Sequence, residues 1–275
     1  MISIPYIHYI LQFADNALMN GHRISEWCGH GPVLEQDIAL INTALDHIGQ
    51  ARNFYQYAAE LTNQLPQEEK LRLFMSNAIN QKLASGSDIT EDDLAYLRDA
   101  WDYRNILLLE QPNVDWAYTV IRSFFYDQFT NLVYAQLIHA KDERLAAIAE
   151  KSLKESKYHK KWSSEWVIRL GDGTEESHQR IITALEERWN YSGECFIDSE
   201  ADRYATTLNQ VGLPSGLRAE WNNNVFEIFN EATIDLPDTK VWMHEGGKTG
   251  THSEHLGYIL ADLQFMQRAY PGMEW

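Results

Sequence analysis

Apolar residues along most of this chain recur every three or four positions, the spacing that places them on one side of an α-helix. The first such segment ends near Gly29–Pro32, and a second runs from Pro32 to about Leu61. The apolar positions that define the first segment are Ile7, Ile10, Leu11, Ala14 and Leu18. The pattern predicts two long consecutive helices.

The same spacing predicts further helices. Residues 65–85 indicate a short helix followed by a loop at 85–88, and acidic residues in 88–101 favour a helix start there. Two long helices are expected over 114–140 and 142–170, and shorter ones over 175–193, 196–210, 214–234 and 252–269. We expect an all-α chain in which four long helices form a bundle with inward-facing polar side chains and additional helices surround it.

Composition supports a packed interior and one unit. Of the 275 residues, 44% are hydrophobic and 12% are aromatic, enough for one substantial core. Since no linker interrupts the pattern, a single domain over residues 1–275 is predicted. The net charge of −17 argues against nucleic-acid binding, because the protein would repel phosphates.

Cysteine usage and the N-terminal segment bear on the compartment. Cys28 and Cys195 are far apart and form no CxxC motif, which suits a reducing cytoplasm and gives no zinc or disulfide framework. The N-terminal segment lacks a basic region and contains Asp15, so we do not interpret it as a signal peptide. No apolar run has the length of a membrane span. We expect a cytoplasmic protein.

The four long predicted helices carry possible metal ligands. Di-iron bundles place a Glu on each of two helices and a Glu-x-x-His pair on each of the other two. Carboxylates bridge the ions, and imidazoles fix the coordination geometry. The candidates here are Glu26, Asp46, His47, Gln50, Asp127, Glu155, Ser156 and His159.

The spacing of these candidates departs from the di-iron pattern. Glu155 lies four residues before His159, and Ser156 occupies the position three before it. On the second helix, His47 lies three residues before Gln50. A spacing of four still shares a helix face, but a neutral amide is a poor substitute for imidazole on iron. The residue types therefore disfavour a complete two-iron site.

Four stretches carry a family resemblance. They are RISEWCGHGPVLEQDIALINTALDHIGQARNFYQYAAEL (23–61), LLLEQPN (107–113), SLKESKYHKKW (152–162) and GGKTGTHSEHLGYILADLQFMQR (246–268). Together they resemble the family of subunits of bacterial ring-1,2-phenylacetyl-CoA epoxidase, and its C-type members in particular. The resemblance implies a ferritin-like fold, in which the A-type member holds the di-iron ligands and the C-type member is its structural partner.

The resemblance also implies what became of each ligand position. The first-helix Glu and third-helix acid correspond to Glu26 and Asp127. The two Glu-x-x-His pairs correspond to His47 with Gln50, and to Ser156 with His159. The set is therefore expected to be vestigial, with no catalytic residue, metal or other cofactor in this chain and the di-iron centre in the partner.

Two other interpretations stay open. One is an active di-iron oxygenase with an atypical ligand set, and the other is a ferritin-like iron carrier. The resemblance implies the catalytic A-type subunit and other subunits of the epoxidase as partners, with a homo-oligomer when the chain is alone. Whether the chain is itself an enzyme is left open at this point. Its nine tryptophans and fourteen tyrosines suit either a core or a protein interface.

Three further segments have weaker signals. HEGGKTG (244–250) lacks the first glycine of a phosphate-binding loop, so a flexible turn is expected, with Lys248 near a CoA tail or a subunit interface as the family-based alternative. In THSEHLG (251–257), Thr251 or Ser253 is expected to cap a helix. Residues 64–86 exceed the family pattern in length, and their contacts are not predicted.

A bundle without ions must still accommodate its carboxylates. Burying an unpaired charge costs several kcal/mol, so we expect most of these carboxylates to gain a partner. The expected partners are Arg52, Arg104, Lys154, Lys157, His47 and Gln50. Glu26 and Asp127 are expected to face each other.

Overall fold

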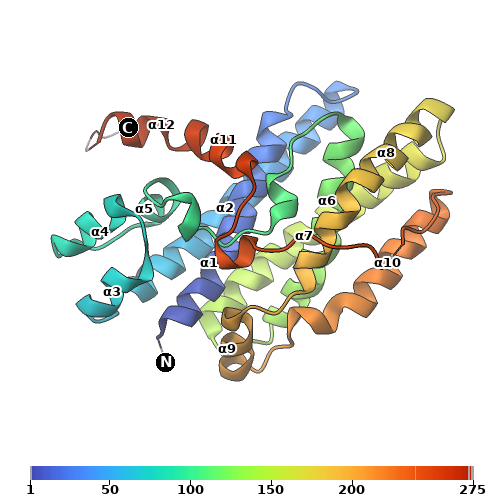
Figure 1. Cartoon of the computed structure of the whole chain (residues 1–275). Coiled ribbons are helices and arrows are strands. Elements are labelled where there is room, and N and C mark those ends of the chain that lie inside the picture. The colour runs from blue at the N-terminus through green and yellow to red at the C-terminus, as the bar shows by residue number, and fades with distance from the viewer. Residues whose placement is uncertain (1, 239, 272, 274–275) are drawn as a thin grey trace.

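The chain forms a bundle of helices in the computed structural model, which describes residues 2–238, 240–271 and 273. Within these residues there are twelve α-helices, short 3-10 turns and no strand (Figure 1). The all-α prediction is confirmed.

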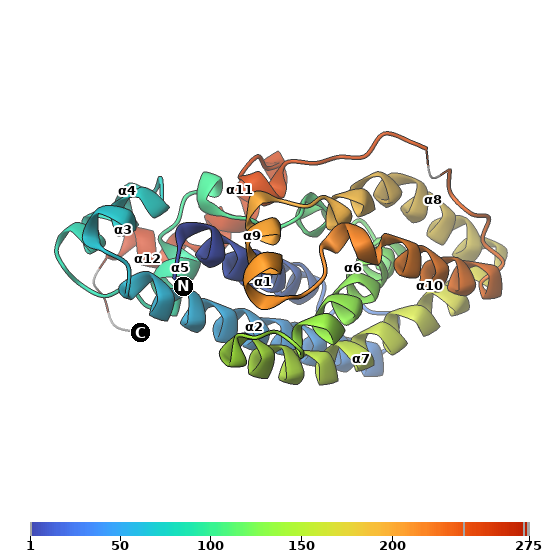
Figure 2. The same ribbon diagram turned by 90° about the horizontal axis from the view of Figure 1, so that it is seen from below.

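Four long helices make the centre of the bundle. They are α1 (Ile4–Glu26), α2 (Leu34–Asn63), α6 (Trp116–Leu137) and α7 (Glu143–Gly171). Helix α1 packs closely along α2, α6 packs closely along α7, and α2 lies beside α7 (Figure 2). This is the predicted four-helix arrangement of a ferritin-like fold.

Side-chain caps fix where three of these helices begin. Ser3 accepts a hydrogen bond from an amide in the first turn of α1, and Asp115 does the same for α6. Asp142 accepts from two amides at the start of α7, both at 3.0 Å. Each such cap contributes roughly 0.5–2 kcal/mol to stability. Helix α2 has no side-chain cap but carries Glu35 and Asp37 in its first turn, where the helix dipole favours negative charge.

The other helices surround this centre. Helices α8 and α10 pack on α6 and α7, and α9 packs on α1. Helices α3, α4 and α5 lie at one end of the bundle, and α11 and α12 lie at the same end (Figure 1). Their bounds are Gln67–Leu73 (α3), Asn77–Ala84 (α4), Glu91–Tyr96 (α5), Glu175–Ser192 (α8), Glu200–Asn209 (α9), Arg218–Glu231 (α10), Glu254–Leu263 (α11) and Phe265–Ala269 (α12).

Several predicted helices are shorter or divided. The helix predicted within 65–85 is two helices, because Phe74 adopts an extended backbone between them. A capping box of Thr90 and Asp93 starts α5, which ends at Tyr96 rather than continuing to residue 101. The segment 252–269 divides into two helices at Gln264.

The long 64–86 segment packs on the 97–102 loop. The amides of Met75 and Ser76 donate to the two carboxylate oxygens of Asp102 at 2.6 and 2.9 Å. The Ser76 hydroxyl donates to the Leu97 carbonyl at 2.5 Å. These bonds attach the segment to the end of the bundle.

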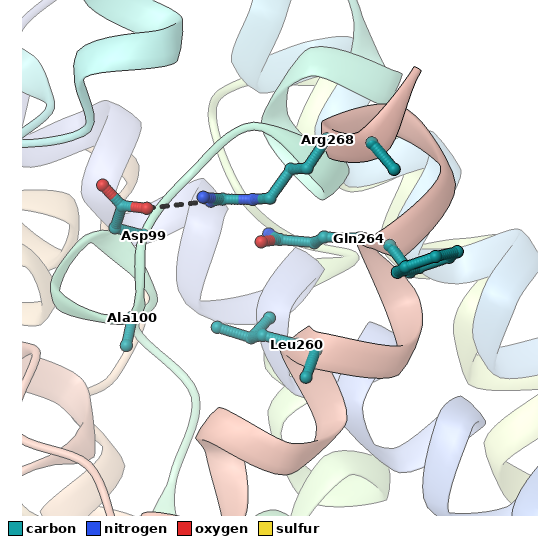
Figure 3. Close-up of a pocket in the computed structure, with 8 residues that line it drawn as sticks. Asp99, Ala100, Leu260, Gln264 and Arg268 are labelled. Carbon is teal, nitrogen blue, oxygen red and sulfur yellow. Dashed lines mark hydrogen bonds and ion pairs between the residues drawn. The ribbon is translucent and has the colours of Figure 1, made fainter. Parts of the chain in front are cut away.

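Helices α11 and α12 cover a surface pocket at this end. Arg268 binds Asp99 at 2.8 Å across the pocket, and the Gln264 amide donates to the Arg98 carbonyl at 2.9 Å (Figure 3). Leu260 and Ala100 line the pocket beside them. The Arg268–Asp99 ion pair is partly exposed and is worth at most about 1 kcal/mol, so we assign the pocket a packing role.

A single hydrophobic core cluster draws residues from the long helices and from those around them. Among the described residues, no helix combines the length and the apolar character needed to cross a bilayer.

A buried ion pair joins α1 to the segment after α5. The Arg98 guanidinium and the Asp15 carboxylate have no solvent exposure, and Arg98 Nη1 lies 3.1 Å from Asp15 Oδ2. The Tyr55 hydroxyl donates to Asp15 at 2.5 Å, and the Arg104 amide donates at 2.8 Å. The carboxylate is therefore fully hydrogen-bonded, which is the condition under which a buried ion pair is tolerated.

Replacing Arg98 by Met should lower the free energy of unfolding by about 3–5 kcal/mol, because Asp15 is left as an uncompensated buried charge. Urea denaturation measures this difference. The matched control is Arg72→Met, which breaks the exposed Arg72–Glu68 pair and should cost less than about 1 kcal/mol. A loss below about 1 kcal/mol for Arg98→Met would contradict the role assigned to the pair.

Candidate functional site

Three potential metal ligands converge at the centre of the bundle. His47 comes from α2, Asp127 from α6 and His159 from α7, and one donor atom from each lies within 4.8 Å of the others. All three side chains are at most 2% exposed. Each helix contributes its ligand from its buried side, so the bundle packing itself brings the three together.

His159 is held in place by a carboxylate on the neighbouring helix. Its Nε2 lies 3.0 Å from Asp46 Oδ2. Because an ionised carboxylate only accepts hydrogen bonds, the ring donates from Nε2. The other ring nitrogen, Nδ1, is buried and has no hydrogen-bond partner among the described residues.

His47 is held by an amide on α1. Its Nε2 lies 2.9 Å from the Asn20 side-chain nitrogen, and its Nδ1 is buried without a partner among the described residues. Asn20 thus occupies the place on α1 that Glu26 was expected to fill. Helical spacing alone did not single out Asn20, although Asn16 and Asn20 are two amides one helical turn apart within an otherwise apolar helix.

Glu26 lies away from this cluster. Its side chain is 56% exposed and is bound by Arg23 Nη1 at 2.7 Å and by the Asn113 amide at 3.1 Å. The prediction that Glu26 faces Asp127 is wrong. Glu26 follows Asn20 by six residues, which is about 9 Å along the helix axis, and its charge is satisfied by Arg23 and solvent.

The remaining predicted positions form ordinary hydrogen bonds. The Tyr134 hydroxyl donates to Gln50 Oε1 at 3.1 Å, and Gln50 Nε2 donates to Glu155 at 2.9 Å. Ser156 accepts from the Asn131 amide at 3.1 Å. The prediction that Gln50 serves as a neutral partner is confirmed, and Glu155 is thereby engaged outside the three-ligand cluster.

The basic side chains predicted as partners are used elsewhere. Arg52 and Lys154 each pair with a surface glutamate, at 3.5 and 3.1 Å. Arg104 donates to main-chain carbonyls, and Lys157 is exposed. The cationic partners proposed for the interior are therefore wrong for these four, and the carboxylates near the site are held by uncharged groups and imidazole.

Burial dominates the electrostatics of the cluster. Both oxygens of Asp127 lack a hydrogen-bond donor among the described residues, and burial raises its pKa to about 6 against the opposing effect of His159. The Ser163 hydroxyl lowers this pKa to a lesser degree, since its own hydrogen bond goes to the His159 carbonyl. Burial, with repulsion from His159, holds the pKa of His47 well below its ordinary value. At neutral pH, His47 is uncharged and Asp127 is largely ionised.

Comparison with known proteins identifies the family. A family model described as phenylacetic acid catabolic protein matches residues 3–275. The chain belongs to this family. It is also 40% identical over 270 residues to the C-type subunit of the 1,2-phenylacetyl-CoA epoxidase of Escherichia coli (strain K12), an alignment that covers 97% of this chain and 98% of that protein. The resemblance that the sequence motifs indicated is confirmed.

The residues of this family member do not fit a two-iron centre. The cluster offers one carboxylate and two imidazoles, whereas two iron ions in a bundle are bridged and neutralised by several carboxylates. Of the other acids near the site, Asp46 binds His159, Glu155 binds Gln50 and Glu26 lies at the surface. We therefore derive no chemical step through such a centre.

The glycine-rich segment of this family member is packed rather than flexible. Lys248 is buried, and its ammonium donates to the Ile197 carbonyl at 2.8 Å and to Asp202 at 3.3 Å. A side chain held in this way is not available to a CoA tail. The capping prediction for Ser253 is also wrong, because its hydroxyl donates to Glu110 at 2.6 Å.

Replacing Asp127 by Asn should stabilise protein from which metal has been removed by a chelator. The rise of the Asp127 pKa from 3.8 to about 6 means that the folded state disfavours the ionised carboxylate. At roughly 1.4 kcal/mol per pH unit, the gain should reach about 3 kcal/mol at pH 7 to 8. It should shrink as the pH falls from 6 towards 4, where the folded wild type takes up the proton.

Urea denaturation at several pH values measures this difference. The matched control is Glu26→Gln, which removes an exposed carboxylate and should give no stabilisation. If Asp127→Asn destabilises the chelator-treated protein at pH 8, the Asp127 carboxylate has a compensating partner beyond those described.

Proposed function

We propose that this chain is a subunit of a 1,2-phenylacetyl-CoA epoxidase that does not itself carry out the oxidation, and that it binds and stabilises the di-iron catalytic subunit. Identity to the C-type subunit of such an epoxidase along nearly the whole chain supports the assignment to this complex. The observation that carries the non-catalytic role is the hydrogen bond of Gln50 to Glu155. It occupies a carboxylate that a two-iron centre would need.

Helix α2 supports the partner-binding role. It has an exposed apolar stripe, which we name the α2 stripe and which consists of Leu34, Ile38, Ile41 and Leu45, each 44–70% exposed. Successive members are three or four residues apart, so they share one side of the helix. At 100° per residue this side is nearly opposite to the one that carries His47 and the other buried residues.

A helix that is apolar on two opposite sides is covered on both in its working state. The interior of the bundle covers one side of α2, and we infer that the α2 stripe is covered by the catalytic partner. A stable interface of this kind buries more than about 1,000 Å². The same stripe would support self-association when the chain is alone. The two cysteines form no disulfide, in keeping with a cytoplasmic complex.

Elemental analysis of the chain purified alone should find far fewer than two iron ions per chain. The reason is that one carboxylate cannot bridge and neutralise two iron ions. When the chain is co-purified with its catalytic partner, iron should be recovered at about two ions per heterodimer. About two iron ions per chain in the isolated protein, lost in Asp127→Asn, would instead support an active di-iron subunit or an iron carrier.

Introducing charge into the α2 stripe should prevent assembly. Ile38→Asp and Leu45→Asp should each weaken binding to the catalytic partner at least about thirtyfold, the effect of a hot-spot residue worth about 2 kcal/mol or more. Co-expression followed by size-exclusion chromatography and titration calorimetry measures this change. Met75→Asp is the matched control, since Met75 is 73% exposed but lies outside the stripe. Unchanged binding in both stripe variants would remove α2 from the interface.

A further inference from the structure

The three-ligand cluster at the bundle centre has a composition and placement that suit one metal ion rather than two. We propose that His47, Asp127 and His159 bind a single divalent transition-metal ion such as Zn²⁺ or Co²⁺. This goes beyond the proposed function, which needs no ion in this chain. It also revises the expectation, drawn from the family resemblance, that the chain holds no metal.

The donor atoms of the cluster are free to bind. The Nδ1 atoms of both histidines and both carboxylate oxygens of Asp127 are buried and have no hydrogen-bond partner among the described residues. Buried polar atoms are nearly always paired, so several unpaired ones at one point require an explanation. All three residues place a ligand atom within 4.8 Å of the others, and an ion between them would satisfy one atom of each.

The groups behind the two histidines set the ring orientation that binding requires. Asp46 accepts from His159 Nε2, which leaves the lone pair of Nδ1 for an ion. A carboxylate behind a ligating histidine is the usual support of such sites. The Asn20 amide can turn its oxygen to His47 Nε2, which fixes the matching form of His47 and gives the otherwise unpartnered Asn20 oxygen a donor.

The ligand chemistry selects the class of ion. Two imidazoles with one carboxylate suit Zn²⁺, Co²⁺ and similar ions, whereas Mg²⁺ and Ca²⁺ prefer sites built from oxygen alone. The charge is also balanced, because Asp127 and the supporting Asp46 together offset a divalent ion. Neither His47 nor His159 needs to be protonated for this balance.

Binding requires a small inward movement of the side chains. Tetrahedral ligands at about 2.0–2.1 Å from the ion lie about 3.4 Å from one another, so atoms up to 4.8 Å apart must close by about 1 Å. Rotations of the His47 and His159 rings about their side-chain bonds can supply this movement without shifting the helices. A water molecule or Asn20 would complete the coordination.

Titration of the full-length, chelator-treated chain with Co²⁺ tests the proposal. The visible d–d absorption should saturate at one Co²⁺ per chain and should be displaced by one equivalent of Zn²⁺. Asp127→Asn and His159→Gln should abolish the saturable signal. Asp46→Asn, which removes only the support of His159, should weaken Co²⁺ binding by about 10- to 100-fold. The control His30→Gln changes an exposed histidine outside the cluster and should bind as the wild type does.

The outcomes separate this proposal from the proposed function. No saturable Co²⁺ signal in the wild type overturns the site and leaves the subunit role intact. A signal that survives both Asp127→Asn and His159→Gln, in variants shown to be helical by circular dichroism, also overturns it. If a ligand variant fails to fold, the wild-type stoichiometry and the partly exposed Asp46 position still decide the question. Two irons per isolated chain would instead overturn the proposed function.

Discussion

Side-chain hydrogen bonds join α2 to α7 along most of the length of both helices. The Arg144–Glu60 pair lies at one end, at 3.2 Å, and the Trp166 indole binds Gln36 at the other, at 2.8 Å. Between them lie Glu155 with Gln50 and His159 with Asp46. The pairs run in opposite order along the two helices, so this polar seam fixes their antiparallel register. In a ferritin-like bundle with iron, ligands from these two helices are joined through the ions; here direct bonds between side chains join them.

The seam also explains how the interior tolerates acidic residues. A charge removed from water costs several kcal/mol unless a partner compensates for it. Asp46 and Glu155 meet this condition at the seam, and Asp15 meets it through Arg98 and the groups around it. Asp127 is different, because it lies on α6, outside the seam, and burial raises its pKa to about 6. The side chain without a partner is thus the one that faces both free imidazole nitrogens.

Periodicity was sufficient to predict the four long helices, because each has enough turns to show its apolar spacing. It failed where local bonds interrupt a helix, as at Phe74 and Gln264. For the site, it identified His47, Asp127 and His159 but chose Glu26 on the first helix. Helical spacing shows which side of a helix a residue occupies, but not how far two helices are shifted along their axes. That shift depends on the packing of α1 against α2, and it brings Asn20 rather than Glu26 level with His47.

Helix α2 is the common wall between the interior and the surface proposed to bind a partner. Its inward side carries His47 and Gln50, and its outward side carries the α2 stripe. The two sides are separated by no more than the diameter of a helix, about 10 Å. A partner that packs on Ile38 and Leu45 therefore senses any shift or rotation of α2, and the bonds of the seam restrain such motion. Loss of the iron ligands removes chemistry from this chain, but a partner still needs a fixed helix to pack on. Hence the side chains that replaced those ligands are ones that still bind α2 to α7.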